Sequence, residues 1–266
     1  MTWQLLLNLP NQRIVSRFKT EYWVIRNGQV YHQNRLIRQA DSDSLMVWLD
    51  NDPDFVSLIA KDKNHVYFAW KKTKIDPHTF RSYHCWWLDK QGVYTEGENN
   101  LYPIKGADSA TFQHIGDSYA IDKNHAYSYN TIIKSCKNPQ KLRMLTPLSY
   151  YATDEDHVYW GGKLLKGAKP QSWRQLKFKD NDASYSTDGE GIYWCDNKLG
   201  FAKFDDWEYL VDGYSKTKKA VYHLAWVIKG ENPQDWDENK AIEYAKEKQR
   251  LSDESHQAMM KKLGYL

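Results

Sequence analysis

A short pattern of residues recurs along this chain, and it constrains the fold more than any other feature. The pattern is an aromatic residue, two further residues, Asp, three residues, a small or β-branched apolar residue, and Tyr. It is complete at residues 119–127, and strings at 62–67 and 154–159 repeat most of it. The closing residue recurs as Tyr31, Tyr67, Tyr94, Tyr127, Tyr159, Tyr193 and Tyr222, at intervals of 27 to 36 residues. Such a period indicates a repeat protein.

A second signature follows each closing Tyr. It reads Asp-Pro-His-Thr-Phe at residues 76–80 and Lys-Pro-Gln-Ser-Trp at 169–173. Its last residue lies 13 to 15 positions after the Tyr in six units and 18 positions after it in the third. Asp favours a helix N-cap and Pro favours the first helical position, so we expect a single helical turn. Its closing aromatic residue should fill the space between neighbouring units.

The Asp of the first signature predicts a tight turn. An Asp carboxylate accepts backbone N–H groups two residues further on, and Gly or Asn tolerates the positive φ that a hairpin requires. The residues after the turn are aromatic or β-branched, which is typical of a half-buried strand. The predicted turn residues are Asp62, Asp89, Asp122, Asp154 and Asp188. Thr217 and Arg26 take this place in the seventh and first units.

These patterns predict an all-β repeat protein of about seven stacked β-hairpin units, each of about 32 residues and about three strands. The units should stack because one hairpin alone is barely stable in water. We expect an N-terminal cap over residues 1–20, the repeats over 21–236, and a C-terminal α-helical cap over 237–266, where strong helix formers begin. Common propeller repeats have about 40–50 residues. We therefore expect an open twisted stack, with a closed propeller-like ring as the alternative.

The string Asp-Lys-Asn-His-Val-Tyr at residues 62–67 resembles the DKNYY repeat family of bacterial proteins. The resemblance is close at 59–80, 119–130 and 151–173, and it covers roughly 20–240 when all seven units are included. This chain has His-Val-Tyr or His-Ala-Tyr in place of the Tyr-Tyr of the family name, but it keeps the Asp and the following Tyr. The resemblance implies a binding scaffold with no catalytic residues to carry over. Some members resemble companions of secreted bacterial toxins.

The candidates for metal or catalytic chemistry are weak. His65, His125 and His157 share one column of the repeat, but neighbouring strands lie about 5 Å apart, whereas zinc needs donors at about 2.1 Å from one centre. Asp154 and Asp156 lack the following Gly and Glu that would complete a calcium loop. We therefore expect no enzyme activity, no metal and no cofactor.

Composition restricts the partners and the compartment. A formal net charge of +3 does not select nucleic acid. The mean hydropathy is −0.80, and no apolar run approaches the ~18 residues of a membrane span. The N-terminal residues do not resemble a signal peptide. Three widely spaced cysteines, Cys85, Cys136 and Cys195, fit reduced thiols and a cytoplasmic protein.

The residue after each closing Tyr differs from unit to unit, which indicates weaker packing constraints there. Trp160 and Trp194 occupy this column in adjacent units, and Trp70 lies two residues further along in the second unit. Trp is a favoured anchor at protein interfaces. The predicted partner-binding residues are Phe68, Trp70, Trp160, Trp194 and His223. The alternative is that these tryptophans are buried against the neighbouring unit.

Three functions are compatible with these features. The leading hypothesis is a non-catalytic protein-binding scaffold, specifically a cytoplasmic immunity protein that binds and neutralises a bacterial toxin. The alternative is a carbohydrate- or peptidoglycan-binding repeat protein, because the chain is rich in aromatic residues. An enzyme of another kind would need a clustered polar site, which the sequence does not indicate.

Overall fold

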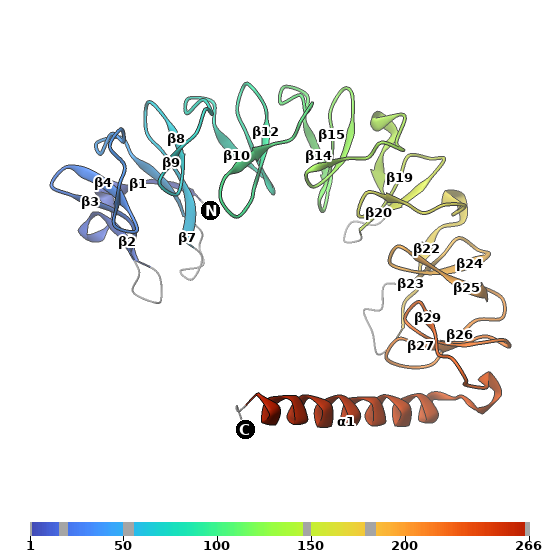
Figure 1. The fold of residues 1–266 in the computed structure, drawn as a ribbon. Coiled ribbons are helices and arrows are strands. Elements are labelled where there is room, and N and C mark those ends of the chain that lie inside the picture. Colours follow the sequence, from blue (N-terminus) through green and yellow to red (C-terminus); the bar gives the residue numbers. More distant parts are fainter. Residues whose placement is uncertain (1, 16–20, 50–55, 146–149, 179–184, 264–266) are drawn as a thin grey trace. The chain divides into compact units, whose positions relative to one another are not determined.

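The computed structural model describes residues 2–15, 21–49, 56–145, 150–178 and 185–263 (Figure 1). In this part of the chain, small antiparallel sheets follow one another and a single long helix ends the row. The chain divides into two compact units, Met1–Leu142 and Arg143–Leu266. The first contains four of the repeats predicted from the sequence, and the second contains three.

Each repeat of the first unit forms a meander of antiparallel strands. The first sheet consists of β2 (Arg13–Val15), β3 (Glu21–Arg26), β4 (Gln29–His32) and β5 (Arg35–Leu36). The second consists of β1 (Thr2–Leu5), β6 (Met46–Leu49), β7 (Val56–Lys61), β8 (Val66–Phe68) and β9 (Lys71–Lys72). The third consists of β10 (Arg81–Tyr83), β11 (Trp86–Leu88), β12 (Val93–Glu96) and β13 (Leu101–Pro103). The fourth consists of β14 (Gln113–Gly116), β15 (Tyr119–Ile121), β16 (Ala126–Ser128) and β17 (Thr131–Ile132).

The second unit continues the same meander and then ends in a helix. The fifth sheet consists of β18 (Arg143–Met144), β19 (Tyr151–Thr153), β20 (Val158–Trp160) and β21 (Lys163–Leu164). The sixth consists of β22 (Arg174–Gln175), β23 (Tyr185–Thr187), β24 (Gly191–Trp194) and β25 (Asn197–Lys203). The seventh consists of β26 (Glu208–Tyr209), β27 (Tyr214–Lys216), β28 (Val221–His223) and β29 (Trp226–Val227), and α1 (Glu238–Lys262) follows.

The structure confirms the all-β repeat fold, and it adds a strand to the predicted unit of about three. The extra strand is short and pairs with the strand that carries the closing Tyr, as in the register Tyr67↔Lys72. A tight turn connects the two strands, and Ala69 adopts a positive φ of 52° there. The N–H of Ala69 donates to the carbonyl of Leu58 at 2.6 Å, which holds the turn against the preceding strand. The choice between an open row and a closed ring stays a prediction.

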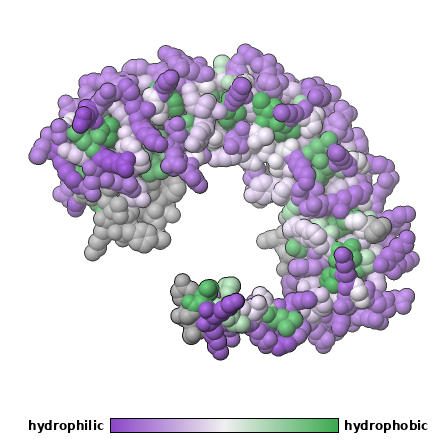
Figure 2. All heavy atoms as spheres, viewed as in Figure 1, coloured by the Kyte–Doolittle hydropathy of each residue, from purple (hydrophilic) through white to green (hydrophobic). Residues whose placement is uncertain are grey.

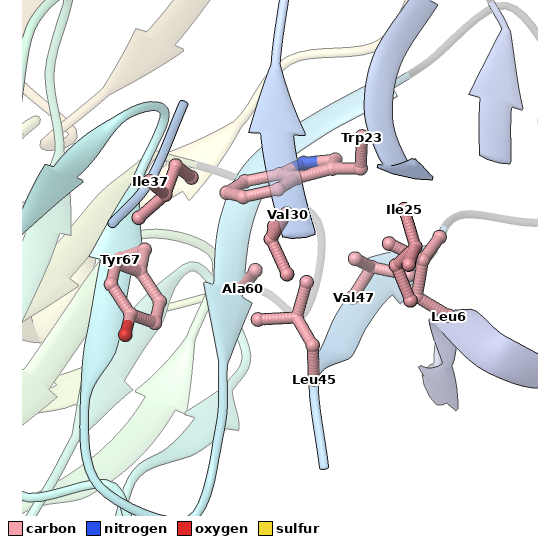
Figure 3. Close-up of a cluster of buried hydrophobic side chains, with 9 residues drawn as sticks. All are labelled: Leu6, Trp23, Ile25, Val30, Ile37, Leu45, Val47, Ala60 and Tyr67. Atoms are coloured by element: carbon pink, nitrogen blue, oxygen red, sulfur yellow. The ribbon is translucent and has the colours of Figure 1, made fainter. Parts of the chain in front are cut away.

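The hydrophobic core is divided into clusters, most of which lie between neighbouring repeats. Figure 3 shows the first of them, in which Trp23 and Val30 of the first repeat meet Val47, Ala60 and Tyr67 of the second. The next cluster contains Phe80, the closing residue of the second signature, which stacks on the Trp87 ring of the third repeat at 4.9 Å. Because these side chains are buried only when two sheets meet, no single repeat has a complete core.

The second signature forms the expected single helical turn in three of its copies that contain Pro, whereas the copy at 76–80 forms a non-helical turn. Turns of 3₁₀ helix lie at Pro139–Lys141, Pro170–Ser172 and Pro233–Asp235, each with Pro at its start. The Asp of the Asp-Pro-His-Thr copy accepts a hydrogen bond at 2.7 Å from the Thr79 hydroxyl. These turns place the closing aromatic residues between the sheets.

The two chain ends differ in how they join the repeats. The described part of the predicted N-terminal cap contributes β1 to the second sheet and β2 to the first, and its Leu6 lies in the first core cluster. At the other end, the Asp237 carboxylate caps α1 by accepting the N–H of Lys240 at 2.8 Å. Only the first turns of α1 pack on the seventh repeat, where Ala241 is buried.

Most of α1 is exposed, and no helix in the described ranges is both long and apolar enough to cross a membrane. On the face shown in Figure 2, hydrophobic residues form small separate patches among hydrophilic ones. On this face, candidate sites are therefore small groups of exposed side chains rather than one broad apolar surface.

Candidate binding edge

In four repeats, the turn Asp links the repeat to the one before it. One carboxylate oxygen of Asp122 accepts the backbone N–H groups of Asn124 and His125, both at 2.7 Å. The other accepts the Tyr127 hydroxyl at 2.6 Å and the backbone N–H of Asp108, in the preceding turn, at 2.8 Å. The Asp and the Tyr therefore recur at a fixed spacing in the sequence because both belong to one buried hydrogen-bond network.

The same network recurs in both compact units. Asp62, Asp89 and Asp188 each accept the hydroxyl of their own Tyr. They also accept the backbone N–H of Asp41, Asp76 and Lys169, respectively, from the preceding turn. In the seventh repeat, the Thr217 hydroxyl accepts two turn N–H groups in place of the carboxylate. The turn Asp residues thus have a structural role in the sheets.

These contacts determine the charge of the network. Burial would raise the pKa of Asp122, but hydrogen bonds from Tyr127 and from backbone N–H groups outweigh it and hold the pKa below its ordinary value. The pKa values of Asp154 and Asp188 are lowered in the same way. Burial and the neighbouring carboxylate raise the pKa of Tyr127 far above its ordinary value. The network therefore holds an ionised Asp and a neutral Tyr at neutral pH.

The turn histidines lie beside their own Asp instead of converging on one another. The Nδ1 atom of His157 lies 3.1 Å from the Asp154 carboxylate, and those of His65 and His125 lie 3.9 and 4.0 Å from theirs. Among the described residues, no group of three or more His, Cys, Asp or Glu side chains could hold a metal ion.

The residue directly after the closing Tyr differs in its exposure from repeat to repeat. His32, Phe68 and Thr95 are buried. Trp160 and Trp194 are half-buried, and His223 is exposed. Phe68 lies in the core cluster between the second and third repeats. The five predicted binding residues therefore do not form one surface.

Four aromatic residues gather on the second unit, and we refer to them as the aromatic edge: Tyr150, Trp160, Trp194 and Trp226. The Trp194 ring meets the edge of Trp226 at a centroid distance of 5.6 Å, and Trp226 is 60% exposed. The Trp160 ring lies 5.8 Å from that of Tyr150, which is 54% exposed. Both pairs present aromatic surface at the end of a β-strand.

Two contacts join the repeats that carry these pairs. The Lys163 ammonium lies 2.6 Å from the Asp196 carboxylate, and the Tyr151 hydroxyl donates to the carbonyl of Cys195 at 3.0 Å. His223 is the register partner of Trp226, and its ring stacks on Tyr214 at 4.4 Å. Burial lowers the pKa of His223, which favours the neutral form.

Sequence reasoning missed Trp226, although the chain contains a signal for it. Trp226 lies four residues after its closing Tyr. The corresponding residues of five other repeats are Arg35, Lys71, Thr131, Lys163 and Asn197. A Trp in a column that is otherwise polar indicates an exposed aromatic side chain.

The predicted residue Trp70 lies on the first unit, where it is 37% exposed. The Arg35 guanidinium lies 4.2 Å from the centre of its ring, and the Lys71 ammonium lies 5.7 Å from it. Trp70 thus belongs to a separate, positively charged surface.

Comparison with known proteins identifies the repeat. The model of the DKNYY family matches the chain twice, over residues 86–146 and 138–198. Searches of curated proteins and of solved structures found no match. The matched span contains the units that close at Tyr94, Tyr127, Tyr159 and Tyr193, each with the network described above or its turn Asp. Residues 86–198 therefore consist of repeats of the DKNYY family.

Proposed function

We propose that the protein is a non-catalytic protein-binding scaffold that contacts its partner through the aromatic edge. The observation that carries this proposal is the 60% exposure of Trp226 beside the half-buried Trp194. Trp23, Trp86 and Trp236 are fully buried in the same structure. Exposed aromatic rings lose unfavourable contact with water when a partner covers them, and Trp and Tyr dominate the binding energy of many interfaces.

The surroundings of the aromatic edge support a protein partner. Lys163 and Asp196 form an ion pair between the two aromatic pairs, and both belong to the rim of the edge. Aromatic residues surrounded by polar residues are typical of interfaces in which a few central side chains supply most of the affinity. Rigid strands carry all four rings or lie directly beside them, so binding would order few side chains.

We propose further that the partner is a bacterial toxin and that this protein is its cytoplasmic immunity protein. The resemblance of DKNYY repeats to companions of secreted toxins supports this choice. No disulfide joins Cys85, Cys136 and Cys195 in the described part of the chain, which agrees with a reduced compartment. On this proposal, binding alone neutralises the toxin, and the protein turns over no substrate.

Affinity capture tests the proposal. The tagged protein is incubated with lysate of its native cell and with the products of neighbouring genes, and bound proteins are identified by mass spectrometry. We expect one stoichiometric partner that is toxic when it is expressed alone. The double variant Trp194→Ala/Trp226→Ala should weaken its binding at least about 100-fold, because two anchor side chains are removed.

The control is Tyr102→Ala, which removes a 51% exposed aromatic side chain from the third repeat. It should leave the affinity unchanged. Equal binding by the double variant and the wild type would exclude the aromatic edge as the contact surface. Retention on a glycan array without any protein partner, abolished by the same double variant, would instead establish the carbohydrate-binding function.

A further inference from the structure

A pocket of about 310 Å³ lies on the first compact unit, where the first three repeats approach one another. Its walls combine polar residues with apolar and aromatic ones, and the latter include Tyr22, Leu58, Phe68 and Trp70. The exposed side chains of Lys71 and Glu98 lie at its rim. This volume is at the lower end of the range for small-molecule sites, about 300–1,000 Å³. The pocket can therefore hold one ring.

The buried polar member of this lining is His32. Its side chain is 1% exposed, and neither ring nitrogen has a hydrogen-bond partner. Burial lowers the pKa of His32 to about 4, so the imidazole is neutral at physiological pH. A neutral imidazole has one N–H donor and one nitrogen acceptor. A buried polar group without a partner is unusual in a native protein and requires an explanation.

Aromatic rings surround His32, and they differ in their exposure to solvent. The centroids of Trp23, Tyr22 and Trp70 lie 4.8, 5.8 and 6.1 Å from that of His32. Trp23 is fully buried, whereas Trp70 is more than one-third exposed. Rotation of the Trp70 side chain towards solvent is therefore the change that gives a ligand access to the covered nitrogens of His32.

We propose that this pocket binds a phenol group, whose ring packs against Tyr22 and Trp70 and whose hydroxyl hydrogen-bonds to His32. A buried imidazole that lacks a hydrogen-bond partner and lies among aromatic rings favours a ligand with a ring of its own and one group able to donate or accept a hydrogen bond. A sugar carries several hydroxyls, and this lining offers one buried polar side chain to receive them. A carboxylate would lose its hydration beside a neutral imidazole. The rim carries one cation, Lys71, and one anion, Glu98, so it does not favour a charged ligand of either sign.

The phenol comes from one of two sources: the tyrosine side chain of a polypeptide, or a free phenolic compound. The rim favours the polypeptide, because the Gln33 and Asn99 carboxamides can bind the amide groups that flank a tyrosine. This site and the aromatic edge belong to different compact units. A failure of the phenol test therefore leaves the capture experiment and its Trp194 and Trp226 variants unaffected.

The test is an NMR titration of the full-length protein with isotope-labelled histidine, which resolves the imidazole signals of its nine histidines. The variant His32→Phe assigns the His32 signal. The probes are N-acetyl-tyrosinamide, N-acetyl-phenylalaninamide and p-cresol. We expect the tyrosine amide to shift the His32 signal in a saturable manner and to bind at least about 10-fold more tightly than the phenylalanine amide, which lacks the hydroxyl.

Two variants separate the hydroxyl contact from general loss of structure. His32→Phe should keep the fold, since one ring replaces another, and should bind both amides equally. His78→Phe changes an exposed histidine outside the lining and should keep the preference of the wild type. Weaker binding of p-cresol than of the tyrosine amide would identify a polypeptide ligand, and the reverse would identify a free phenol.

Equal affinity of the wild type for the two amides, or a His32 signal that does not move, would overturn the proposal. Methyl α-glucoside serves as a further probe. A saturable shift of the His32 signal with the glucoside but not with the tyrosine amide would also overturn it, in favour of a sugar.

Discussion

The first and second compact units contain the same repeat but treat the residue after the closing Tyr differently. In the first unit, His32, Phe68 and Thr95 are buried and Ser128 is half-buried, whereas in the second unit Trp160 and Trp194 are half-buried and His223 is exposed. Both units contain the antiparallel meander and the turn network. The difference shows that the repeat fixes the backbone, while the side chains around each position decide how far it is buried.

Neighbouring loops explain much of this difference. In the first unit, the loop that follows β12 approaches the second repeat, where the Lys71 ammonium donates to the carbonyl of Asn99 at 3.3 Å. The same loop contributes Glu98 and Asn99 to the pocket beside Trp70. In the second unit, the turn after Trp160 is Gly161-Gly162, which adds no side chain that could cover the ring.

The largest expected effect tests whether the turn network is common to both units. Asp122→Ala and Asp188→Ala should each lower the free energy of unfolding by about 5 kcal/mol, because each leaves a Tyr hydroxyl and several backbone N–H groups unpaired. Urea denaturation measures the loss, and Asp156→Ala, at an exposed turn position, is the control. If only one of the two variants lost stability, the turn network would not stabilise both units in the same way.

The second prediction compares the residue after the closing Tyr in the two units. Phe68→Ala should cost about 4 kcal/mol, because it opens a cavity in a core cluster. Trp194→Ala should cost about 1–2 kcal/mol, because its ring is only half-buried. Both values come from urea denaturation of the single variants. Equal costs would mean that Trp194 supports its sheets as much as Phe68 does.

The third effect is a pH dependence specific to the first unit. The pKa of His32 is about 4 in the folded protein and 6.5 ordinarily, so the fold disfavours the protonated form. The stabilisation that comes from keeping the His32 imidazole neutral is complete above pH 6.5. It decreases as the pH falls towards 4, by up to about 3 kcal/mol. Urea denaturation between pH 7 and 4 should show a smaller loss for His32→Phe than for the wild type.

The charged groups near His32 are Glu98 and Lys71 at the pocket rim and Arg35 beside Trp70. Both proteins contain these groups, so the difference between the two proteins is the relevant quantity. His78→Phe should follow the wild type, since His78 is exposed. Parallel curves for His32→Phe and the wild type would show that His32 does not carry this dependence.

The smallest effect on stability belongs to the most exposed ring of the aromatic edge. Trp226→Ala should change the free energy of unfolding by less than about 0.5 kcal/mol, because the side chain makes few buried contacts. The measurement is urea denaturation, carried out beside partner capture. A large loss of stability would assign Trp226 to the support of the seventh repeat and weaken the contrast between the two units.

The sequence predicted those features that depend on nearby residues. The turn Asp, the hairpin and the closing Tyr are joined within six residues by one network, so a repeated string reveals them. The short strands β5 and β9 have two residues each and no detectable periodicity, which is why the fourth strand of each meander was missed. Exposure was the least predictable feature, because the loop containing Glu98 and Asn99 comes from the next repeat.

The turn network also has a direction. The Asp122 carboxylate accepts its donor from Asp108, which precedes it in the chain, and Asp62, Asp89 and Asp188 do the same with their own preceding turns. On a ribosome the N-terminal part of a chain emerges first. Each of these repeats therefore meets a donor that has already been synthesised, and the row can be assembled in the order of translation, one sheet on the last.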